Sequence, residues 1–311
     1  MSICFDAKLG EVGSEGERIG VSSPHRLFRH TPILDLEMSE IVAHPASGKR
    51  PHQTAYIDRL AINISSREHV LKEVERVIEA RETGHFIAVT NPESMFLGQR
   101  ISSIRGYMNN ADFSVCDGVG VIVAGWAWGH LVPRLPGPTL QLLCHEWGVS
   151  RGWRHFYYGG KAGVADEMAR RLKEKFPGLI VCGTYCPPFG ELSPEEDSHI
   201  VDIIDEAKPD IVWVGLGLPK QERWIAAHQD RLGVPWLIGV GGAFDYHSGA
   251  IPWAPQWIRA IGMEWLFRLI IEPKMRLKRT WRHLIYVSQT SLKGLLTLRF
   301  LRACRSAVKQ A

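Results

Sequence analysis

Short apolar runs alternate with helix-period segments through the middle of the chain, and this alternation is the feature that most constrains the fold. Beyond Gly163 an apolar residue recurs every four positions, which places these residues on one helix face. The next helix has a clear start, with a cap at Ser193, Pro194 as its first residue and a capping-box glutamate at Glu196. Strands that alternate with helices predict an α/β fold with a Rossmann-like, largely parallel sheet. The predicted strands are residues 85–90, 155–158, 179–183, 211–216 and 236–240.

Three segments differ in character. Residues 1–55 are rich in Gly, Ser, Pro and His and lack sustained periodicity, so we expect a poorly ordered N-terminal extension. Residues 56–245 carry the strand–helix alternation and form the predicted α/β catalytic core. Residues 246–311 form a predicted basic amphipathic appendage, with a helix over 258–271 that Pro273 is expected to end or kink.

Charge is distributed unevenly along the chain. Residues 273–311 contain ten basic and no acidic residues, whereas residues 1–272 hold 27 basic and 33 acidic residues. A cationic segment beside an apolar stripe is typical of a helix on an anionic membrane surface. A terminal helix that packs the stripe on its own core is an alternative. A nucleic-acid partner is not expected, because phosphate binding requires no apolar stripe. The stripe consists of Trp281, Leu284, Ile285, Leu292, Leu295 and Leu296.

The composition, with 45% hydrophobic and 23% charged residues, is that of an ordinary globular protein. The longest apolar run lies near residues 119–129, which is shorter than the roughly 18–20 residues of a membrane span, and no signal peptide is expected. The six cysteines form no C-x-x-C motif and no zinc-type spacing, which favours buried free thiols. We therefore expect a cytoplasmic protein.

Polar or glycine-rich residues follow each apolar run. Ligands of parallel α/β sheets bind beyond the carboxyl ends of the strands, so these exits predict one binding face. Asp117 follows an apolar strand and precedes Gly118, which suits a general base; an Asx turn or a helix cap is the simpler alternative. Asp245 has a similar setting, and capping is the stronger alternative there. Neither a dinucleotide fingerprint nor a P-loop is present, which disfavours a nucleotide-dependent oxidoreductase.

An ordered set of motifs resembles the WecG/TagA/CpsF glycosyltransferases, glycosyltransferase family twenty-six, from about residue 56 to about residue 284. Each motif is weak alone, and the order makes the set specific. The matching segments are Asn91-Pro92-Glu93, Ala111-Asp112-Phe113 with Asp117-Gly118, Gly159-Gly160 with Gly163-Val164-Ala165, residues 215–224 around Pro219-Lys220-Gln221-Glu222, residues 239–245, residues 262–269 and Glu272-Pro273.

The resemblance implies a sugar transfer with inversion, from a UDP-sugar to an amino sugar on a polyprenyl diphosphate, during the synthesis of cell-surface polysaccharide. It implies a location on the inner face of the cytoplasmic membrane and allows a homo-oligomer. It makes Asp117 the base that deprotonates the acceptor hydroxyl. The predicted substrate-binding residues are Thr90, Asn91, Gly159, Gly160, Lys220, Gln221, Gly241, Asp245, Arg268, Arg276 and Arg279.

No D-x-D motif occurs in the chain, so the usual carboxylate pair for a metal-bound nucleotide sugar is missing. We expect neither a metal nor a cofactor, and cations and helix N-termini would neutralise the UDP leaving group. Arg268, Arg276, Lys278 and Arg279 are available for this role, and membrane attraction is their alternative role.

The chain departs from the family pattern in four places. Thr90 and Asn91 are adjacent where the family usually has one residue between them, Thr139 replaces a common acidic residue, Trp253 replaces an arginine, and Met275 stands where an arginine often occurs. These departures suggest an unusual donor or acceptor, and they leave a non-catalytic polysaccharide-assembly factor as an alternative. The sequence specifies neither the sugar nor the acceptor.

Overall fold

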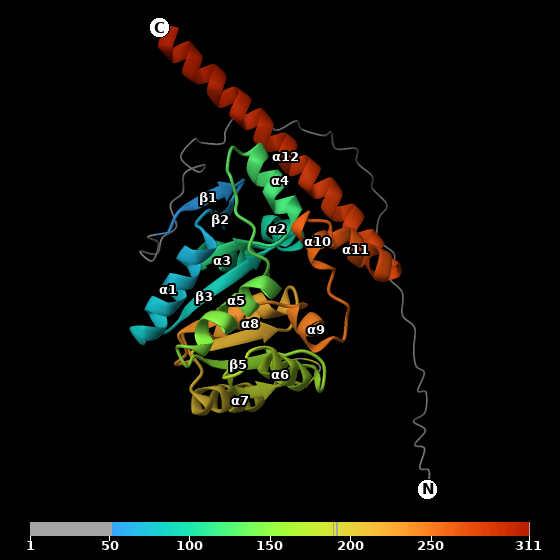
Figure 1. Ribbon diagram of the computed structural model, residues 1–311. Coiled ribbons are helices and arrows are strands. Elements are labelled where there is room, and N and C mark those ends of the chain that lie inside the picture. The colour runs from blue at the N-terminus through green and yellow to red at the C-terminus, as the bar shows by residue number, and fades with distance from the viewer. Residues whose placement is uncertain (1–51, 189, 191, 311) are drawn as a thin grey trace, which may run out of the picture. The chain divides into compact units, whose positions relative to one another are not determined.

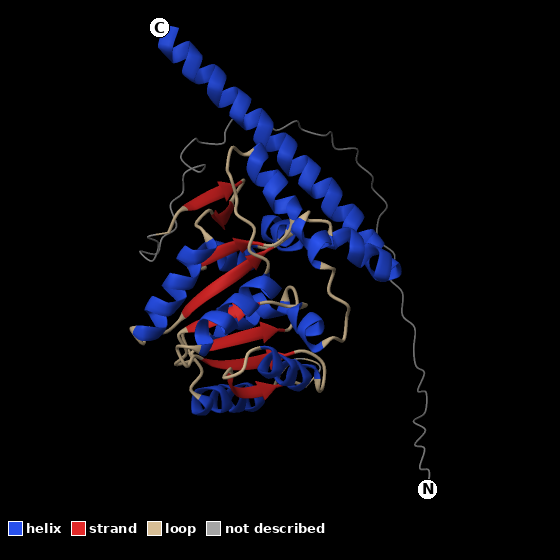
Figure 2. Ribbon diagram, viewed as in Figure 1, coloured by secondary structure: helices blue, strands red, loops and turns tan. Residues whose placement is uncertain are grey.

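The computed structural model describes residues 52–188, 190 and 192–310. Six strands in this part form one sheet in the order β4-β3-β8-β7-β5-β6, and every neighbouring pair is parallel (Figures 1 and 2). The predicted α/β fold and the five predicted strands are therefore confirmed. The strands are β3 (His85–Thr90), β4 (Phe113–Cys116), β5 (Arg154–Gly159), β6 (Ile180–Tyr185), β7 (Ile211–Gly215) and β8 (Trp236–Gly239).

Central strands are apolar on both sides because helices cover both faces of the sheet. In β7, Val212 and Val214 enter one hydrophobic core, while Ile211 and Trp213 enter the other. This alternation is the period-2 pattern of a pleated strand. The apolar runs of the sequence are therefore sheet interior.

Two sets of helices form the outer layers. One core buries residues of α2 (Pro92–Arg100), α3 (Ser102–Asn110), α7 (Pro194–Ala207) and α8 (Lys220–His228). The opposite core buries residues of α1 (Arg67–Glu79), α5 (Gly137–Val149), α6 (Val164–Lys175) and α9 (Ala243–Ser248). Adjacent strands β3 and β8 lead into α2 and α9, which lie on opposite faces. Such a switch point opens a crevice beyond the strand ends.

The capping signals act as the sequence indicates. Ser193 Oγ accepts from the backbone N–H of Glu196, and the Glu196 carboxylate accepts from that of Ser193, so the predicted capping box of α7 is confirmed. Asn91 caps α2 in a similar way, with Ser94 as its reciprocal partner. A small hairpin of β1 (Thr54–Ile57) and β2 (Leu60–Asn63) precedes these layers.

The predicted single helix over residues 258–271 is wrong. The structure has two helices there, α10 (Gln256–Ala260) and α11 (Glu264–Ile271). Gly262 lies between them with φ +76°, and a Cβ at this position would come within 2.2 Å of Val119. The break therefore lets the chain pass close to α4 (Val119–Ala127). The prediction that Pro273 ends the preceding helix is confirmed, since α11 stops at Ile271 and Pro273 begins α12 (Pro273–Gln310).

Helix α12 runs parallel to α4 and lies beside it (Figure 1). Gly120 leaves room for Val287, and further along both helices Trp128 Nε1 donates to the Thr290 carbonyl at 3.1 Å. Tyr286 is buried and donates to the Met95 carbonyl of α2. By contrast, the predicted apolar stripe of α12 is exposed along its length, so it does not pack on the protein's own core.

Most of the predicted N-terminal extension lies outside the described residues. The division between a core of 56–245 and an appendage of 246–311 stays a prediction. In the described part of the chain, no helix has both the length and the hydropathy of a membrane span.

Candidate active site

A cavity of about 760 Å³ lies at the switch point of the sheet. It is bounded by the residues that leave β3, β4 and β8, as expected for a parallel α/β sheet. Helices α11 and α12 supply the opposite wall. Residues far apart in the sequence, from Val89 to Ser288, therefore meet in one pocket.

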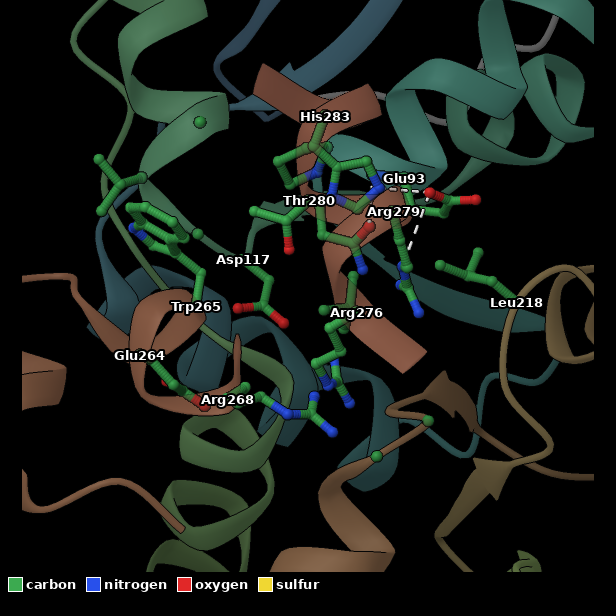
Figure 3. Close-up of a pocket in the computed structure, with 18 of the residues that line it drawn as sticks. Glu93, Asp117, Leu218, Glu264, Trp265, Arg268, Arg276, Arg279, Thr280 and His283 are labelled. Carbon is green, nitrogen blue, oxygen red and sulfur yellow. Dashed lines mark hydrogen bonds and ion pairs between the residues drawn. The ribbon is translucent and has the colours of Figure 1, made fainter. Parts of the chain in front are cut away.

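Asp117 lies in the middle of the labelled side chains in Figure 3. Its backbone N–H donates to the Thr90 carbonyl at 2.7 Å, which continues the β3–β4 pairing by one residue. Gly118 then turns the chain into α4 with φ +110°, a conformation that favours glycine. The carboxylate of Asp117 is thereby held at the strand end and faces the cavity.

Burial raises the pKa of Asp117 to about 6, and the nearby carboxylate of Glu264 adds to the increase. The charges of Arg134 and Arg268 act in the opposite direction. A carboxylate with this pKa is ionised at neutral pH and is a stronger base than an exposed aspartate. The group can therefore accept a proton from a hydroxyl placed in the cavity.

Arg134 and Glu264 belong to this site, although the sequence analysis missed both. Arg134 Nη2 lies 3.4 Å from Glu264 Oε2, and its Nη1 donates to the Arg259 carbonyl. The loop that carries Arg134 returns along β4 through a bridge to Cys116. No periodicity marks that loop, and only the bridge brings its arginine beside Asp117.

Three arginines form the cationic side of the cavity. Arg268 comes from α11, and Arg276 and Arg279 come from α12. Glu272 pairs with Arg276 at 2.6 Å and lies 3.8 Å from Arg268. Burial lowers the pKa of Arg279, and the neighbouring arginines add to this effect. The positive charges of these neighbouring arginines repel one another. The cluster is therefore suited to an anion of high charge, such as a diphosphate.

Glu93 fastens α12 to α2 next to these arginines (Figure 3). Its carboxylate accepts from Arg282 at 2.5 and 2.7 Å and from His283, and Arg279 lies 3.6 Å away. Although burial acts against it, these hydrogen bonds and the charge of Arg279 lower the pKa of Glu93 to about 2. The pairing therefore holds the wall of the cavity in place.

Gln221 reaches the cavity from the first turn of α8. Its Nε2 donates to Glu222 Oε1 at 2.9 Å, while its buried Oε1 has no hydrogen-bond partner among the described residues. Gly239 and Gly241 make room for the amide, since a Cβ at either position would lie 3.0–3.3 Å from it. Burial raises the pKa of Glu222 to about 7. The unsatisfied Gln221 oxygen is a ready acceptor for a ligand.

The structure brings most of the predicted site residues together. Asp117 and Asn91 line the cavity on one side, and Asn91 Oδ1 also caps α2 at 2.9 and 3.0 Å from two backbone N–H groups. Burial raises the pKa of Asp245, which lines the cavity from α9. The other predicted residues that line it are Gln221, Gly241, Arg268, Arg276 and Arg279.

Four predicted residues lie outside the lining of this cavity. Thr90 is buried and shares a 2.6 Å hydrogen bond with Ser114. Gly159 packs on the backbone of Gly215, and a Cβ on Gly159 would come within 2.7 Å of that backbone. The role that the structure supports for Gly159 is therefore close packing. Gly160 follows it in the same turn, and Lys220 begins α8. Lys278 is likewise absent from the lining.

Residues 52–188, 190 and 192–310 contain no cluster of three or more His, Cys, Asp or Glu placed to hold a metal ion. Of the carboxylates that line the cavity, Glu93 and Glu264 form ion pairs with arginines. The arrangement offers a base at the centre and a polyanion site beside it.

Known proteins have sequences similar to this chain. The model of the "Glycosyl transferase WecG/TagA/CpsF family" matches residues 56–299. An N-acetylglucosaminyldiphosphoundecaprenol N-acetyl-beta-D-mannosaminyltransferase of Bacillus spizizenii is 28% identical over 236 residues, which are 76% of this chain and 88% of the relative. A protein of the same name from Staphylococcus aureus is 27% identical over 225 residues, 71% of this chain and 87% of the relative.

Proposed function

Since the chain belongs to the WecG/TagA/CpsF glycosyltransferase family, we propose that it transfers a sugar from a UDP-sugar to an amino sugar on a polyprenyl diphosphate, with inversion. The observation that carries the proposal is the placement of Asp117 beside the arginine cluster in one cavity. Its relatives bear names that specify an N-acetylmannosaminyl group and an acceptor with N-acetylglucosamine on undecaprenyl diphosphate. These are the first donor and acceptor to test.

The proposed reaction is a single displacement. The acceptor hydroxyl attacks the anomeric carbon on the face opposite UDP, the carbon–oxygen bond to UDP breaks with its electron pair, and Asp117 takes the hydroxyl proton. Inversion follows from attack on the opposite face. A base with a pKa of about 6 accepts this proton as the new bond forms.

The leaving diphosphate is the second requirement. Arg268, Arg276 and Arg279 are placed to balance the charge that develops on UDP, and guanidinium groups pair with phosphate oxygens in a bidentate way. Glu272 and Glu93 are the carboxylates that pair with this cluster. We propose that the diphosphate replaces part of these pairings and that no metal ion is needed.

Gln221 and Asn91 are proposed to orient the sugars. The unsatisfied Gln221 Oε1 suits a sugar hydroxyl or amide N–H. The Oδ1 atom of Asn91 is used by the helix cap, so its Nδ2 is the group that would donate to a ligand. Arg134 is proposed to hold Asp117 ionised through its charge.

The appendage is proposed to attach the protein to the inner face of the cytoplasmic membrane. Helices α10 to α12 expose large apolar side chains, including Trp257 and Trp281 at 67% and 65% of their surface. Helix α12, which carries Trp281, also carries the basic residues that binding to anionic lipids requires. Binding to anionic vesicles that disappears in high salt supports this proposal; equal binding to neutral vesicles contradicts it.

UDP release tests the proposed reaction. The full chain is incubated with a panel of UDP-sugars and a short-chain prenyl diphosphate that carries N-acetylglucosamine, with and without EDTA. We expect UDP release that needs the acceptor, persists in EDTA and is lost in Asp117→Asn. UDP binding should survive in that variant. Near-normal turnover of Asp117→Asn would refute the base, and no turnover with any pair would favour an assembly factor.

A further inference from the structure

Arg259, Trp253, Tyr246 and Arg268 form a row of contacts, the aromatic row, which ends in the cavity. The Arg259 guanidinium lies 3.7 Å from the centre of the Trp253 ring. The rings of Trp253 and Tyr246 are stacked, with centres 5.9 Å apart and planes at 20°. The Arg268 guanidinium lies 4.9 Å from the centre of the Tyr246 ring. The row therefore leads from α10, through the loop before it and α9, to the arginine of α11.

Few other contacts hold the Arg268 guanidinium in place. Glu272 lies 3.8 Å from it but pairs more closely with Arg276, at 2.6 Å. Arg268 Nε is buried and has no hydrogen-bond partner in the part of the chain that the structure describes. Its two Nη atoms face Gly242, where a Cβ would lie 3.8–3.9 Å away. Since its ion pair is long and its Nε is unpaired, this charge depends on the Tyr246 ring for its position.

The energetics of the contact favour a fixed arginine. A guanidinium is attracted to the face of an aromatic ring, and more strongly where water is excluded. Tyr246 is buried, and stacking on Trp253 holds its ring in turn. A long arginine side chain loses conformational freedom when it binds an anion, and a contact that fixes it beforehand removes part of this cost from binding. The aromatic row therefore prepares Arg268 for an anion.

We propose that Tyr246 and Trp253 are positioning residues for the diphosphate site, because the aromatic row fixes Arg268 in the cavity before the nucleotide sugar arrives. This inference rests on the proposed function, which assigns the UDP diphosphate to Arg268. Trp253 does not line the cavity, so it acts only through its neighbours in the row. It is also one of the four departures from the family pattern, and the aromatic row gives it a role in this chain.

Arg259 connects the aromatic row to the second arginine beside Asp117. The backbone carbonyl of Arg259 accepts from Arg134 Nη1, and its Nε donates to the Ala254 carbonyl at 2.9 Å. Arg134 and Arg268 are the cations whose charges lower the pKa of Asp117 against the effect of burial. Both of them are thus anchored to one residue that lies outside the lining of the cavity.

Calorimetric titration of the full chain with UDP and with inorganic diphosphate tests the positioning role without turnover. Tyr246→Leu should weaken both ligands about tenfold, because the Arg268 guanidinium then lacks its ring. Tyr246→Phe keeps the ring and should bind both ligands within about twofold of the wild type. Trp253→Leu should weaken both ligands about threefold, and it tests the row even where Tyr246→Leu does not fold.

An Arg268→Gln background shows whether Tyr246 acts through Arg268. If it does, adding Tyr246→Leu to Arg268→Gln should change the affinity for UDP by less than about twofold. Trp147→Leu is the matched control, because Arg151 lies 4.7 Å from the centre of the Trp147 ring and neither residue lines the cavity. This variant removes a similar pair of cation and ring and should bind both ligands as the wild type does.

Several results would overturn the proposal. Unchanged affinities in Tyr246→Leu or Trp253→Leu would do so, as would equal losses in Tyr246→Phe and Tyr246→Leu. Additive losses in the double variant, the same loss in Trp147→Leu, or a wild type that binds neither ligand would also contradict it. UDP release judges the sugar transfer separately. A protein that binds UDP in the expected pattern but releases none from any donor and acceptor would keep the role of the aromatic row and lose the proposed reaction.

Discussion

Replacement of Asp117 by asparagine is expected to make the protein more stable while it abolishes turnover. The native state holds the Asp117 carboxylate in a partly buried site, where its pKa rises from 3.8 to about 6. A carboxyl group with a raised native pKa destabilises the folded state wherever it is ionised, because the unfolded chain releases the proton more easily. Asparagine keeps the size of the side chain and removes this cost.

The magnitude follows from the shift of about two pKa units, which corresponds to roughly 3 kcal/mol at 1.36 kcal/mol per unit. Water in the cavity screens the carboxylate, so we expect a measured gain of about 1–3 kcal/mol for Asp117→Asn at pH 8. For a protein of this size, that gain corresponds to a Tm increase of roughly 2–10 °C. The difference in free energy of unfolding between Asp117→Asn and the wild type should increase between about pH 4 and pH 6 and stay constant above pH 7.

Urea unfolding at pH 8 and pH 4 measures the effect, with Asp202→Asn as the control because Asp202 is an exposed aspartate of α7. The control should leave the free energy of unfolding unchanged at both pH values. The reasoning would be refuted if Asp117→Asn and the wild type were equally stable at pH 8, or if the variant lost the same free energy of unfolding at both pH values. Either result would show that the ionised Asp117 does not destabilise the folded protein.

Three further perturbations test other parts of the site. Glu264→Gln should move the acid limb of the kcat–pH profile below its wild-type position near pH 6, because Glu264 raises the pKa of Asp117; a limb that stays in place contradicts this. Glu93→Gln should lower the free energy of unfolding by about 3 kcal/mol at pH 8, and this loss should become smaller as the pH falls toward the Glu93 pKa of about 2. In the same urea titration, Glu68→Gln, which breaks an exposed ion pair with Lys72, should change the free energy of unfolding little. Gly294→Ala should cost about 1–3 kcal/mol in thermal unfolding, since its Cβ would lie 2.7 Å from the Ala127 carbonyl, whereas Gly106→Ala on α3 has open space and should not destabilise.

Local signals predicted much of the fold. The apolar runs became β3, β5, β7 and β8, because a strand covered on both faces needs apolar residues at most positions, and the edge strand β6 followed the same alternation with helices. The capping box at Ser193 was equally readable, since it depends on residues three apart. Strand order could not be predicted in this way, because the pairing of β3 with β8 joins residues 151 positions apart, such as His85 and Trp236.

The candidate site divides in the same way. Asp117 and Gln221 lie at strand and helix ends that the sequence marks, so they could be selected from the pattern. Arg134 reaches the cavity from a loop that has no hydrophobic periodicity. Glu264 follows a helix break at Gly262, and the apolar pattern of the sequence does not reveal this break. The ion pair between Glu93 and Arg282 joins residues 189 positions apart, so no local sequence pattern predicts it.

The wall that α12 contributes to the cavity has a consequence for synthesis of the protein. The chain is made from the N-terminus, and Asp117 leaves the ribosome long before Arg276 and Arg279 do. The α/β layers can therefore assemble while the cavity is still open on one side. A chain that stops after α9 would lack Arg268, Arg276 and Arg279, so its cavity would have no polyanion site. The cationic side of the cavity is thus the last part of the candidate site that the growing chain supplies.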